Sequence, residues 1–579
     1  MGTTVADVMV ATLAASGVRR VYGLPGDSLN GFTDALRRND AVDWAHVRHE
    51  EAAAFAAAGE AGVTGRLAVA AGSCGPGNLH LINGLFDAQR SRVPVLAIAA
   101  QIPRVEIGGE YFQETHPQDL FRECSVYCEM ASTPEQVPRL LRIAMRTALE
   151  RDGVAVLVVP GEVFLAESPS SGAPRPVTGT HSHVRPDDEA LTRAAELLNA
   201  AERPAILGGA GCRDAHDEAV ALADALKAPM VHSLRGKEYL GYDNPYDVGL
   251  TGLIGYSSGY RAMEHCDALL MLGTDFPYRQ FYPSRDVPVV QVDVRGEHIG
   301  RRTEVDVPLV GTVKDTAAAL LPLLRPKSDR SFADRMTGHY RGVRAHLGHL
   351  AEGGSSDGPM HPQHVAAAVD RIANPDAVFT ADVGTPTVWA ARYLTMNGQR
   401  RLIGSFNHGS MANALPHAIG IQASHPGRQV VALCGDGGLT MLLGELITLR
   451  QLHLPVKAVV FNNSALAFVE LEMKAAGFVN YGTGLDDVNL ADVARAAGLF
   501  GARVDRADQL GDALTAAFAH DGPAVIDART ARHELSMPPK ITLEQLKGFT
   551  LFATRTILSG RADEIVELAK TNLRELKFG

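Results

Sequence analysis

Short apolar runs alternate with longer amphipathic segments along most of the chain. This alternation is typical of βαβ units around a largely parallel sheet. The runs that predict strands are residues 18–22, 67–71, 94–99 and 154–159, then 205–207, 268–272 and 289–292, and finally 377–380, 430–433, 456–461 and 524–526. The pattern therefore predicts an α/β fold of three doubly wound parallel-sheet domains.

Polar passages without periodicity suggest where the domains end. Residues 167–187 are rich in Pro, Ser, Gly and Thr, as linkers are, and a second polar passage lies near residues 326–335. We expect domains at residues 1–166, 188–328 and 329–535, with a tail at 536–579. In the tail, apolar residues recur at helical spacing and predict an amphipathic helix: Ile565, Leu568, Ala569, Leu573 and Leu576.

Composition narrows the class of protein. A chain of 579 residues is too long for one domain, and 46% hydrophobic residues indicate a large buried core. The formal net charge of −11 argues against a nucleic-acid binder. The six cysteines form no CxxC pair, the N-terminus lacks a basic leader, and no apolar run approaches the ~18–20 residues of a membrane span. We expect a cytoplasmic protein whose membrane contact, if any, is peripheral.

The most specific motif lies in the last third of the chain. Gly435-Asp436-Gly437-Gly438 ends an apolar run, and Asn462-Asn463 ends the next one, with 24 residues (438 through 461) between Gly437 and Asn462. A carboxylate and an amide oxygen at strand ends are ligands that Mg²⁺ prefers, and glycines let backbone amides approach a diphosphate. An ordinary strand-to-helix turn is the alternative.

This spaced pair of motifs resembles the thiamine-diphosphate (ThDP) enzymes of the pyruvate oxidase, acetohydroxyacid synthase and pyruvate decarboxylase group. The resemblance implies a pyrimidine-binding, a central and a diphosphate-binding domain. It assigns Mg²⁺ to Asp436, Asn463 and the backbone of Ala465. It assigns ThDP contacts to Gly409, Ser410, Met411, Asp436, Gly437, Gly438, Asn463, Ser464, Ala465, Leu466, Ala467, Phe468 and Val469.

The segment Arg48-His49-Glu50 resembles the family's glutamate motif. By that resemblance Glu50 hydrogen-bonds the aminopyrimidine and promotes deprotonation of the thiazolium carbon; without it, Glu50 reads as a solvated first-turn carboxylate. The resemblance also places Phe112, Phe468 and Val383 in the catalytic set, the two phenylalanines lining the passage from thiazolium to flavin. Ala467 stands where the family usually has Gly, which predicts a stiffer or shifted loop.

Within the family, residues 72–85, 111–117, 251–255, 276–278 and 543–549 are similar to the flavin-dependent pyruvate:quinone oxidoreductases. That resemblance implies FAD in the middle domain, held by Thr251, Gly252, Leu253, Ile254, Gly273, Thr274, Asp275, Phe276, Pro277, Tyr278 and Asp293. A strand ending in Asp293 suits a contact to a ribose, although no GxGxxG follows the domain's first strand.

The resemblance predicts oxidative decarboxylation of pyruvate to acetate and CO₂, with electrons passing to FAD and then to a membrane quinone. It also implies a homo-oligomer, at least a dimer and by expectation a tetramer. Residues 550–579 carry five basic and four acidic side chains, +1 in sum, which favours docking on the inner face of the cell membrane. The tail could instead pack on the protein. Three alternatives remain: an acetohydroxyacid synthase-like carboligase, an O₂- and phosphate-dependent pyruvate oxidase, and a non-catalytic scaffold.

Overall fold

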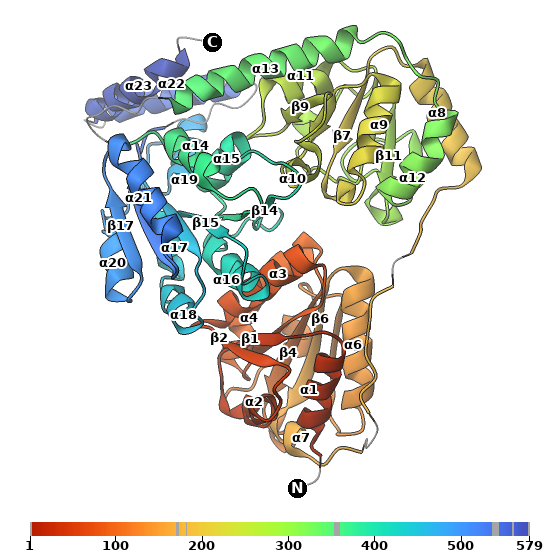
Figure 1. Ribbon diagram of the computed structural model, residues 1–579, viewed down its shortest axis with the longest axis vertical. Coiled ribbons are helices and arrows are strands. Elements are labelled where there is room, and N and C mark those ends of the chain that lie inside the picture. Colours follow the sequence, from red (N-terminus) through yellow and green to blue (C-terminus); the bar gives the residue numbers. More distant parts are fainter. Residues whose placement is uncertain are drawn as a thin grey trace.

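The computed structural model describes residues 3–169, 173–180, 182–352, 359–534, 543–558 and 561–576, with the side chains of 543, 544, 546, 562 and 573–576 left aside. Three six-stranded sheets, parallel throughout, form the frame of the molecule. Helices cover both faces of each sheet, which confirms the α/β class with three doubly wound domains (Figure 1). Within the described residues, no helix is long and apolar enough to cross a bilayer.

The first sheet has the order β2-β1-β3-β4-β6-β5. Its inner strands β3, β4 and β6 are buried along their whole length, because helices lie on both faces. The strands are β1 Arg20–Gly23, β2 Asp43–His46, β3 Ala68–Gly72, β4 Val95–Gln101, β5 Tyr127–Met130 and β6 Val154–Pro160. The helices are α1 Val5–Ala15, α2 Asn30–Arg37, α3 Glu50–Thr64, α4 Pro76–Ser91, α5 Pro117–Leu120, α6 Val137–Arg151 and α7 Gly161–Leu165.

The central sheet has a different order, β12-β11-β10-β7-β8-β9. Counted from its own first strand this is 3-2-1-4-5-6 in reverse, the order of dinucleotide-binding folds. The strands are β7 Pro204–Gly208, β8 Met230–His232, β9 Asp247–Leu250, β10 Ala268–Leu272, β11 Val289–Asp293 and β12 Val307–Val310. The helices are α8 Asp188–Ala200, α9 His216–Leu226, α10 Lys237–Leu240, α11 Ser257–His265 and α12 Val313–Leu320.

The third sheet, β14-β13-β15-β16-β18-β17, repeats the order of the first. Its strands are β13 Val378–Ala381, β14 Arg401–Ile403, β15 Val430–Gly435, β16 Lys457–Asn462, β17 Phe500–Val504 and β18 Ala524–Arg529. The long helix α13 Ser331–Ala351 packs on α11 and β9 of the central domain and on α14 of the third. The other helices of the third domain are α14 Pro362–Ile372, α15 Thr385–Tyr393, α16 Ala414–Ser424, α17 Asp436–Met441, α18 Glu445–Gln451, α19 Ala467–Ala475, α20 Leu490–Ala496 and α21 Ala507–Ala519.

The apolar runs predicted every inner strand of the three sheets except β8. The sequence reading missed seven strands: β2, β5, β8, β9, β12, β14 and β17. All but β8 lie at a sheet edge, and several are only half-buried, so they lack a continuous apolar run. The short β8 has only three residues.

The first and third domains pack against each other through α3 and α16 (Figure 1). Two glycines permit this close crossing. A Cβ on Gly59 would lie 2.5 Å from the carbonyl oxygen of His417, and a Cβ on Gly420 would overlap the carbonyl oxygen of Ala56. The two domains consequently share one hydrophobic core.

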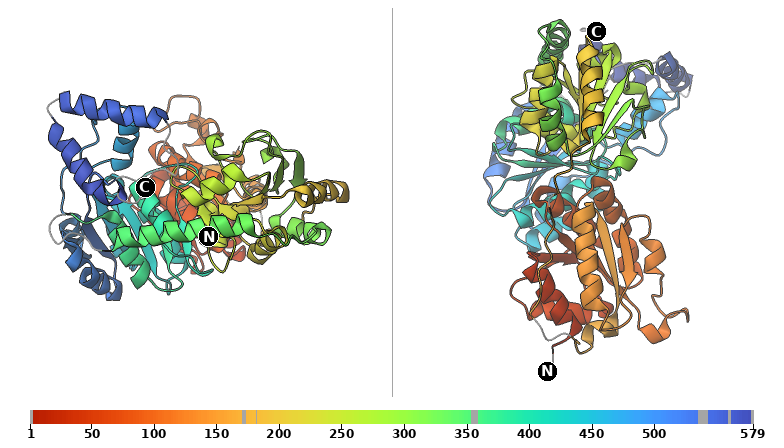
Figure 2. Two further views of the ribbon diagram at one scale, coloured as in Figure 1. Left: turned by 90° about the horizontal axis from the view of Figure 1, so that it is seen from above. Right: turned by 90° about the vertical axis from the view of Figure 1, so that its right-hand side faces the viewer.

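The tail forms two helices, α22 Leu543–Leu558 and α23 Ala562–Leu576, at the outer edge of the third domain (Figure 2). α22 packs on α19, where a Cβ on Gly548 would overlap the carbonyl oxygen of Ala475. Ile565 and Leu568 of the expected apolar stripe are half-buried, whereas Ala569 is exposed; the side chains of Leu573 and Leu576 lie outside the described residues.

Candidate cofactor and active site

One corner of the third sheet brings together the residues expected to hold a metal ion. β15 and β16 are adjacent parallel strands, so their carboxyl ends lie side by side. Asp436 follows β15 directly, and its Oδ2 accepts a hydrogen bond of 2.7 Å from the amide of Ser464, just beyond β16. The Asp436 and Asn463 segments are therefore neighbours in space.

Asp436 is a buried carboxylate, 7% exposed, and no lysine or arginine in the described part of the chain forms an ion pair with it. Burial raises its pKa to about 6, although the amides of Gly437 and Ser464 donate hydrogen bonds to the carboxylate and favour its charged form. Buried charges in proteins are usually paired or coordinate a metal. Asp436 thus has the character of a cation ligand.

The two adjacent asparagines have different surroundings. Asn462 is buried, and its Nδ2 donates to Oδ1 of Asp527 at 2.9 Å. Asn463 is half-buried, and its Oδ1 accepts a local hydrogen bond of 3.1 Å from the amide of Ala465. Asn463 is therefore the better placed of the two to offer an oxygen to an ion beside Asp436, and this oxygen-rich corner fits Mg²⁺.

The glycines of this corner are tightly enclosed. A Cβ on Gly437 would lie 2.8 Å from Leu466 and 3.5 Å from Met411, and a Cβ on Gly438 would overlap the carboxylate of Asp382. Residues assigned to the cofactor from three separate segments therefore converge on one loop. Helix α17 also begins here, and the partial positive charge at its N-terminus would favour a bound diphosphate.

Asp382 is a residue of this corner that sequence reasoning missed. Its Oδ1 accepts from the amide of Ala414 at 2.9 Å and its Oδ2 from the amide of Gly435 at 3.1 Å, so it ties the start of α16 to the end of β15. Burial raises its pKa to about 6. A carboxylate directly after the predicted strand 377–380 was the available signal. Val383, its half-buried neighbour, was the residue expected there.

The loop before α16 contacts the first domain. Gly409 has φ of +86°, a conformation that favours glycine. The hydroxyl of Ser410 accepts a hydrogen bond of 3.0 Å from Nδ2 of Asn83, which also donates to Glu51 at 2.7 Å. Asn83 therefore links the glutamate-bearing helix α3 to the loop expected to contact the pyrimidine, and sequence reasoning did not identify it.

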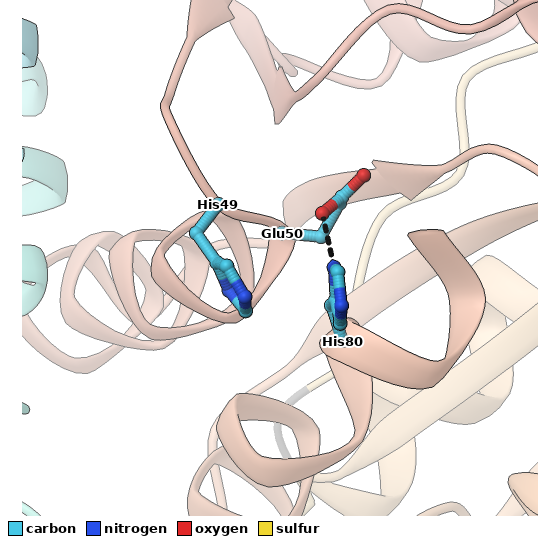
Figure 3. A group of neighbouring side chains, drawn as sticks. All are labelled: His49, Glu50 and His80. Carbon is cyan, nitrogen blue, oxygen red and sulfur yellow. Dashed lines mark hydrogen bonds and ion pairs between the residues drawn. The ribbon is translucent and has the colours of Figure 1, made fainter. Parts of the chain in front are cut away.

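Glu50 is the first residue of α3 and is only 5% exposed, so it is not a solvated first-turn carboxylate. Its Oε2 lies 2.9 Å from Nδ1 of His80, and the ring of His80 stacks on that of His49 with centroids 4.2 Å apart (Figure 3). A Cβ on Gly77 would lie 3.0 Å from Oε1. In the described part of the chain no hydrogen bond or ion pair joins Glu50 to Asp436.

The two aromatic residues expected to line the passage to the flavin differ in exposure. Phe112 is 76% exposed in the loop after β4. Phe468 is half-buried in the first turn of α19, and Val469 next to it is partly exposed. Ala467 begins α19 and does not have positive φ, whereas Ser464 does, at +53°. The residue at 467 therefore does not need the freedom of glycine here.

The residues expected to hold FAD lie at the carboxyl ends of the central strands. Thr251 is 2% exposed, and its Oγ1 has no hydrogen-bond partner among the described residues. Asp293 ends β11 and is buried, with its Oδ1 accepting from the amide of Arg295 at 2.9 Å. An unsatisfied buried hydroxyl is costly, so a polar ligand at this position would stabilise it.

The loops of this crevice are in close contact. A Cβ on Gly252 would lie 2.8 Å from the ring of Phe276, and a Cβ on Gly211 would lie 2.6 Å from Gly273. The remaining expected residues belong to the same loops: Leu253, Ile254, Thr274, Asp275, Pro277 and Tyr278. Gly211 and Gly273 follow β7 and β10, where the strand order reverses, which is where such folds bind dinucleotides. These residues fit FAD.

Three domains of this topology, with a metal corner and a buried glutamate, define a class of cofactor-dependent enzymes. Sequence models of the thiamine pyrophosphate enzymes match in order: the N-terminal TPP-binding domain at residues 3–120, the central domain at 191–320 and the C-terminal TPP-binding domain at 382–528. The chain belongs to the thiamine pyrophosphate enzyme family.

Full-length relatives agree with this assignment. The protein YdaP of Bacillus subtilis, described as thiamine pyrophosphate-containing, is 37% identical over 98% of both chains. A pyruvate oxidase of Lactiplantibacillus plantarum and an acetolactate synthase of Mycobacterium bovis are each 31% identical, over 90% of this chain and 87% of their own. The family thus includes both an oxidase and a carboligase at equal similarity.

Proposed function

We propose that the protein catalyses the oxidative decarboxylation of pyruvate to acetate and CO₂, using ThDP, Mg²⁺ and FAD, with a quinone as the final acceptor. Pyruvate and water then give acetate and CO₂, and two electrons with two protons reduce the quinone. We call the carboxyl ends of β15 and β16, with Asp436 and Asn463, the Asp436 corner. The observation that carries this proposal is that one chain combines this corner with a central sheet whose strand order is that of dinucleotide-binding folds. A flavin at that sheet favours oxidation over simple decarboxylation.

The residues of the first and third domains prepare the decarboxylation. Asp436 and Asn463, with the carbonyl of Ala465, would hold Mg²⁺ and through it the diphosphate. When bound, ThDP supplies the carbon nucleophile and accepts the electrons released as CO₂ leaves. Glu50 would exchange a proton with the cofactor at its carboxylate, which is buried beside His80.

The residues of the central domain would bind FAD. Thr251 offers an unsatisfied hydroxyl and Asp293 a buried carboxylate, both suited to the sugar and phosphate groups of a dinucleotide. When bound, FAD accepts two electrons. The rings of Phe276 and Tyr278, whose centroids lie 5.5 Å apart, present an apolar face at the same crevice.

The quinone and membrane parts of the proposal rest on the tail. Gly548, Phe552 and Thr556 recur every four residues and face the domain, which leaves the other side of α22 outward. That side and α23 expose Leu551, Ile557, Leu558 and Val566. A helix pair with exposed apolar residues and a near-neutral charge is suited to a lipid surface. We therefore place the enzyme in the cytoplasm, bound peripherally to the inner face of the cell membrane.

The proposal includes a homo-oligomer, at least a dimer and by expectation a tetramer. In the ThDP enzymes that the chain resembles, the glutamate of one subunit serves the cofactor held by another. Here Glu50 lies beside the β3–α4 turn of its own domain rather than beside Asp436, which is consistent with such sharing.

One experiment separates the candidate reactions. Purified full-length protein is supplied with Mg-ThDP and pyruvate under anaerobic conditions while the flavin spectrum is recorded, and then quinone, ferricyanide or O₂ is added with and without liposomes. We expect bleaching by pyruvate and fastest reoxidation by quinone with lipid. Acetolactate without bleaching would indicate a carboligase, and acetyl phosphate with peroxide an O₂-dependent oxidase. Failure of pyruvate to bleach a bound flavin would overturn the proposal.

A further inference from the structure

His49, Glu50 and His80 form a cluster of ligand atoms at the start of two helices. One ligand atom of each residue lies within 4.8 Å of the other two. His49 caps α3, Glu50 begins that helix, and His80 lies in the second turn of α4. Figure 3 shows the ring of His80 against the Glu50 carboxylate and the ring of His49 stacked beside that of His80. The three side chains therefore need only small rotations to meet at one point.

The charge of the cluster favours a cation. The only ion-pair partner of Glu50 among the described residues is His80, and no lysine or arginine approaches it. His49 is half-buried beside this carboxylate, and a neutral imidazole is the form of histidine that binds a metal ion. Glu51 adds a second negative charge 3.9 Å from His49. A divalent cation would relieve this uncompensated negative charge.

The ligand types select the kind of cation. Two imidazoles and one carboxylate with positions left open are typical of Zn²⁺ and of Co²⁺, Ni²⁺ or Cu²⁺, whereas Mg²⁺ prefers oxygen alone. The Asp436 corner offers oxygen ligands, so the chain carries two sites of different chemical softness. We propose that His49, Glu50 and His80 form an inhibitory transition-metal site that competes with ThDP for Glu50.

The three ligands are not equivalent. Nδ1 of His80 and Oε2 of Glu50 already lie 2.9 Å apart, a normal separation for two ligands of one ion. His49 accepts a hydrogen bond of 3.2 Å from the amide of Glu51 through Nδ1, and metal binding would give up this helix cap. His80 and Glu50 are therefore the principal ligands, and His49 is the weaker one.

Inhibition follows from the role proposed above for Glu50, and this part rests on that proposed function. A carboxylate that coordinates a metal cannot also exchange a proton with the cofactor. Bound metal should therefore lower turnover, and saturating Mg-ThDP should protect against it.

The binding test uses the full-length protein after removal of ThDP and metals by chelation. Zn²⁺ is titrated calorimetrically in a large excess of Mg²⁺, which occupies the Asp436 corner, and Co²⁺ is followed by its visible absorption. We expect one site per chain. Replacing a residue that only hydrogen-bonds a metal ligand typically lowers metal affinity about 10- to 100-fold. Loss of the ligand itself in His80→Gln should therefore weaken Zn²⁺ binding by at least about tenfold, and His49→Ala should weaken it by less. The exposed His265 on α11 provides the control: His265→Ala should bind as the unmodified protein does.

The outcomes are distinct. Absence of a site, or unchanged affinity in a folded His80→Gln protein, would overturn the metal site whatever the activity. Should His80→Gln fail to fold by circular dichroism, His49→Ala and Mg-ThDP protection against Zn²⁺ binding decide instead. Tight Zn²⁺ binding without inhibition would leave the three metal ligands standing, but it would overturn the inhibitory role proposed for the site and would contradict the role of Glu50 in the proposed reaction.

Discussion

Glu50→Gln is the substitution that best separates the chemistry of the site from its architecture. Glutamine has nearly the same shape, and its amide can keep the contact of 2.9 Å to His80. Glu50 is 5% exposed and has no lysine or arginine partner among the described residues, so the neutral amide avoids the cost of a buried charge. We expect the free energy of unfolding to change by no more than about 1 kcal/mol.

The catalytic effect should be much larger. A positioned acid–base group typically contributes about 10²- to 10⁴-fold to the rate, which corresponds to about 3–5.5 kcal/mol in the activation free energy. Mg-ThDP should still bind, because the Asp436 corner is untouched. Stopped-flow reduction of the flavin by saturating pyruvate measures the rate, and calorimetry measures cofactor binding.

The matched control is Glu51→Gln, which removes a neighbouring charge that is hydrogen-bonded to Asn83. It should slow flavin reduction by less than about tenfold, since Glu51 is not proposed to exchange the proton. Flavin reduction at the unmodified rate in Glu50→Gln would refute the reasoning. Loss of cofactor binding equal to the loss of rate would also refute it, because the residue would then be a binding group only.

Other regions yield further predictions. Burial raises the pKa of Asp436 to about 6, so its carboxylate becomes protonated below that pH and can no longer bind Mg²⁺. Calorimetry between pH 5 and 7.5, on both sides of this pKa, should show the affinity for Mg-ThDP falling about tenfold per pH unit below about pH 6. The Asp436→Asn variant should bind Mg-ThDP weakly at every pH in this range. Gly548→Ala would push α22 away from Ala475, so hydrogen exchange of residues 543–558 should become faster and liposome binding should change. The control is Gly511→Ala on α21, where the added methyl group has open space. It should leave the free energy of unfolding unchanged or raise it by up to about 1 kcal/mol. His417→Gln would remove the imidazole that contacts the buried carboxylate of Asp87 across the α4–α16 contact, and chemical denaturation should show a loss of about 3–5 kcal/mol. Burial opposes ionisation of Asp87, but the His417 contact outweighs it and lowers the pKa below 3.8, so its contribution to stability should be present above pH 3.8 and lost as the pH falls below that value.

The sequence predicted most where physical chemistry acts locally. Inner strands are buried on both faces and must be apolar throughout, so β4 and β15 could be read directly, whereas half-buried edges such as β2 and β17 could not. The tail shows the same limit. The helical spacing of its apolar residues predicted α23, but nothing in the sequence predicted that α22 would pack on α19.

The site divides in a similar way. Asp436 and Asn463 belong to spaced motifs and could be proposed from the sequence, as could Glu50 from its resemblance. Asp382, Asn83 and His80 act through partners that are distant in the chain, and only the packing of α3, α4 and α16 reveals them. A carboxylate after a predicted strand, or a histidine in the second turn of a helix, is too common a pattern to be assigned a role alone.

The repeated topology explains how one chain offers two complementary halves of a cofactor site. The first and third sheets share one strand order, and the α3–α16 contact is reciprocal: Gly59 meets His417 and Gly420 meets Ala56. Both pairs of equivalent positions differ by 361 residues, since 420 − 59 and 417 − 56 give the same number, which indicates a local twofold relation. Under it the start of α3, with Glu50, corresponds to the loop that carries Met411. One copy of the topology therefore carries a buried acid where the other carries the loop expected to contact the cofactor, so the two domains are related in architecture and differ in the residues at equivalent positions.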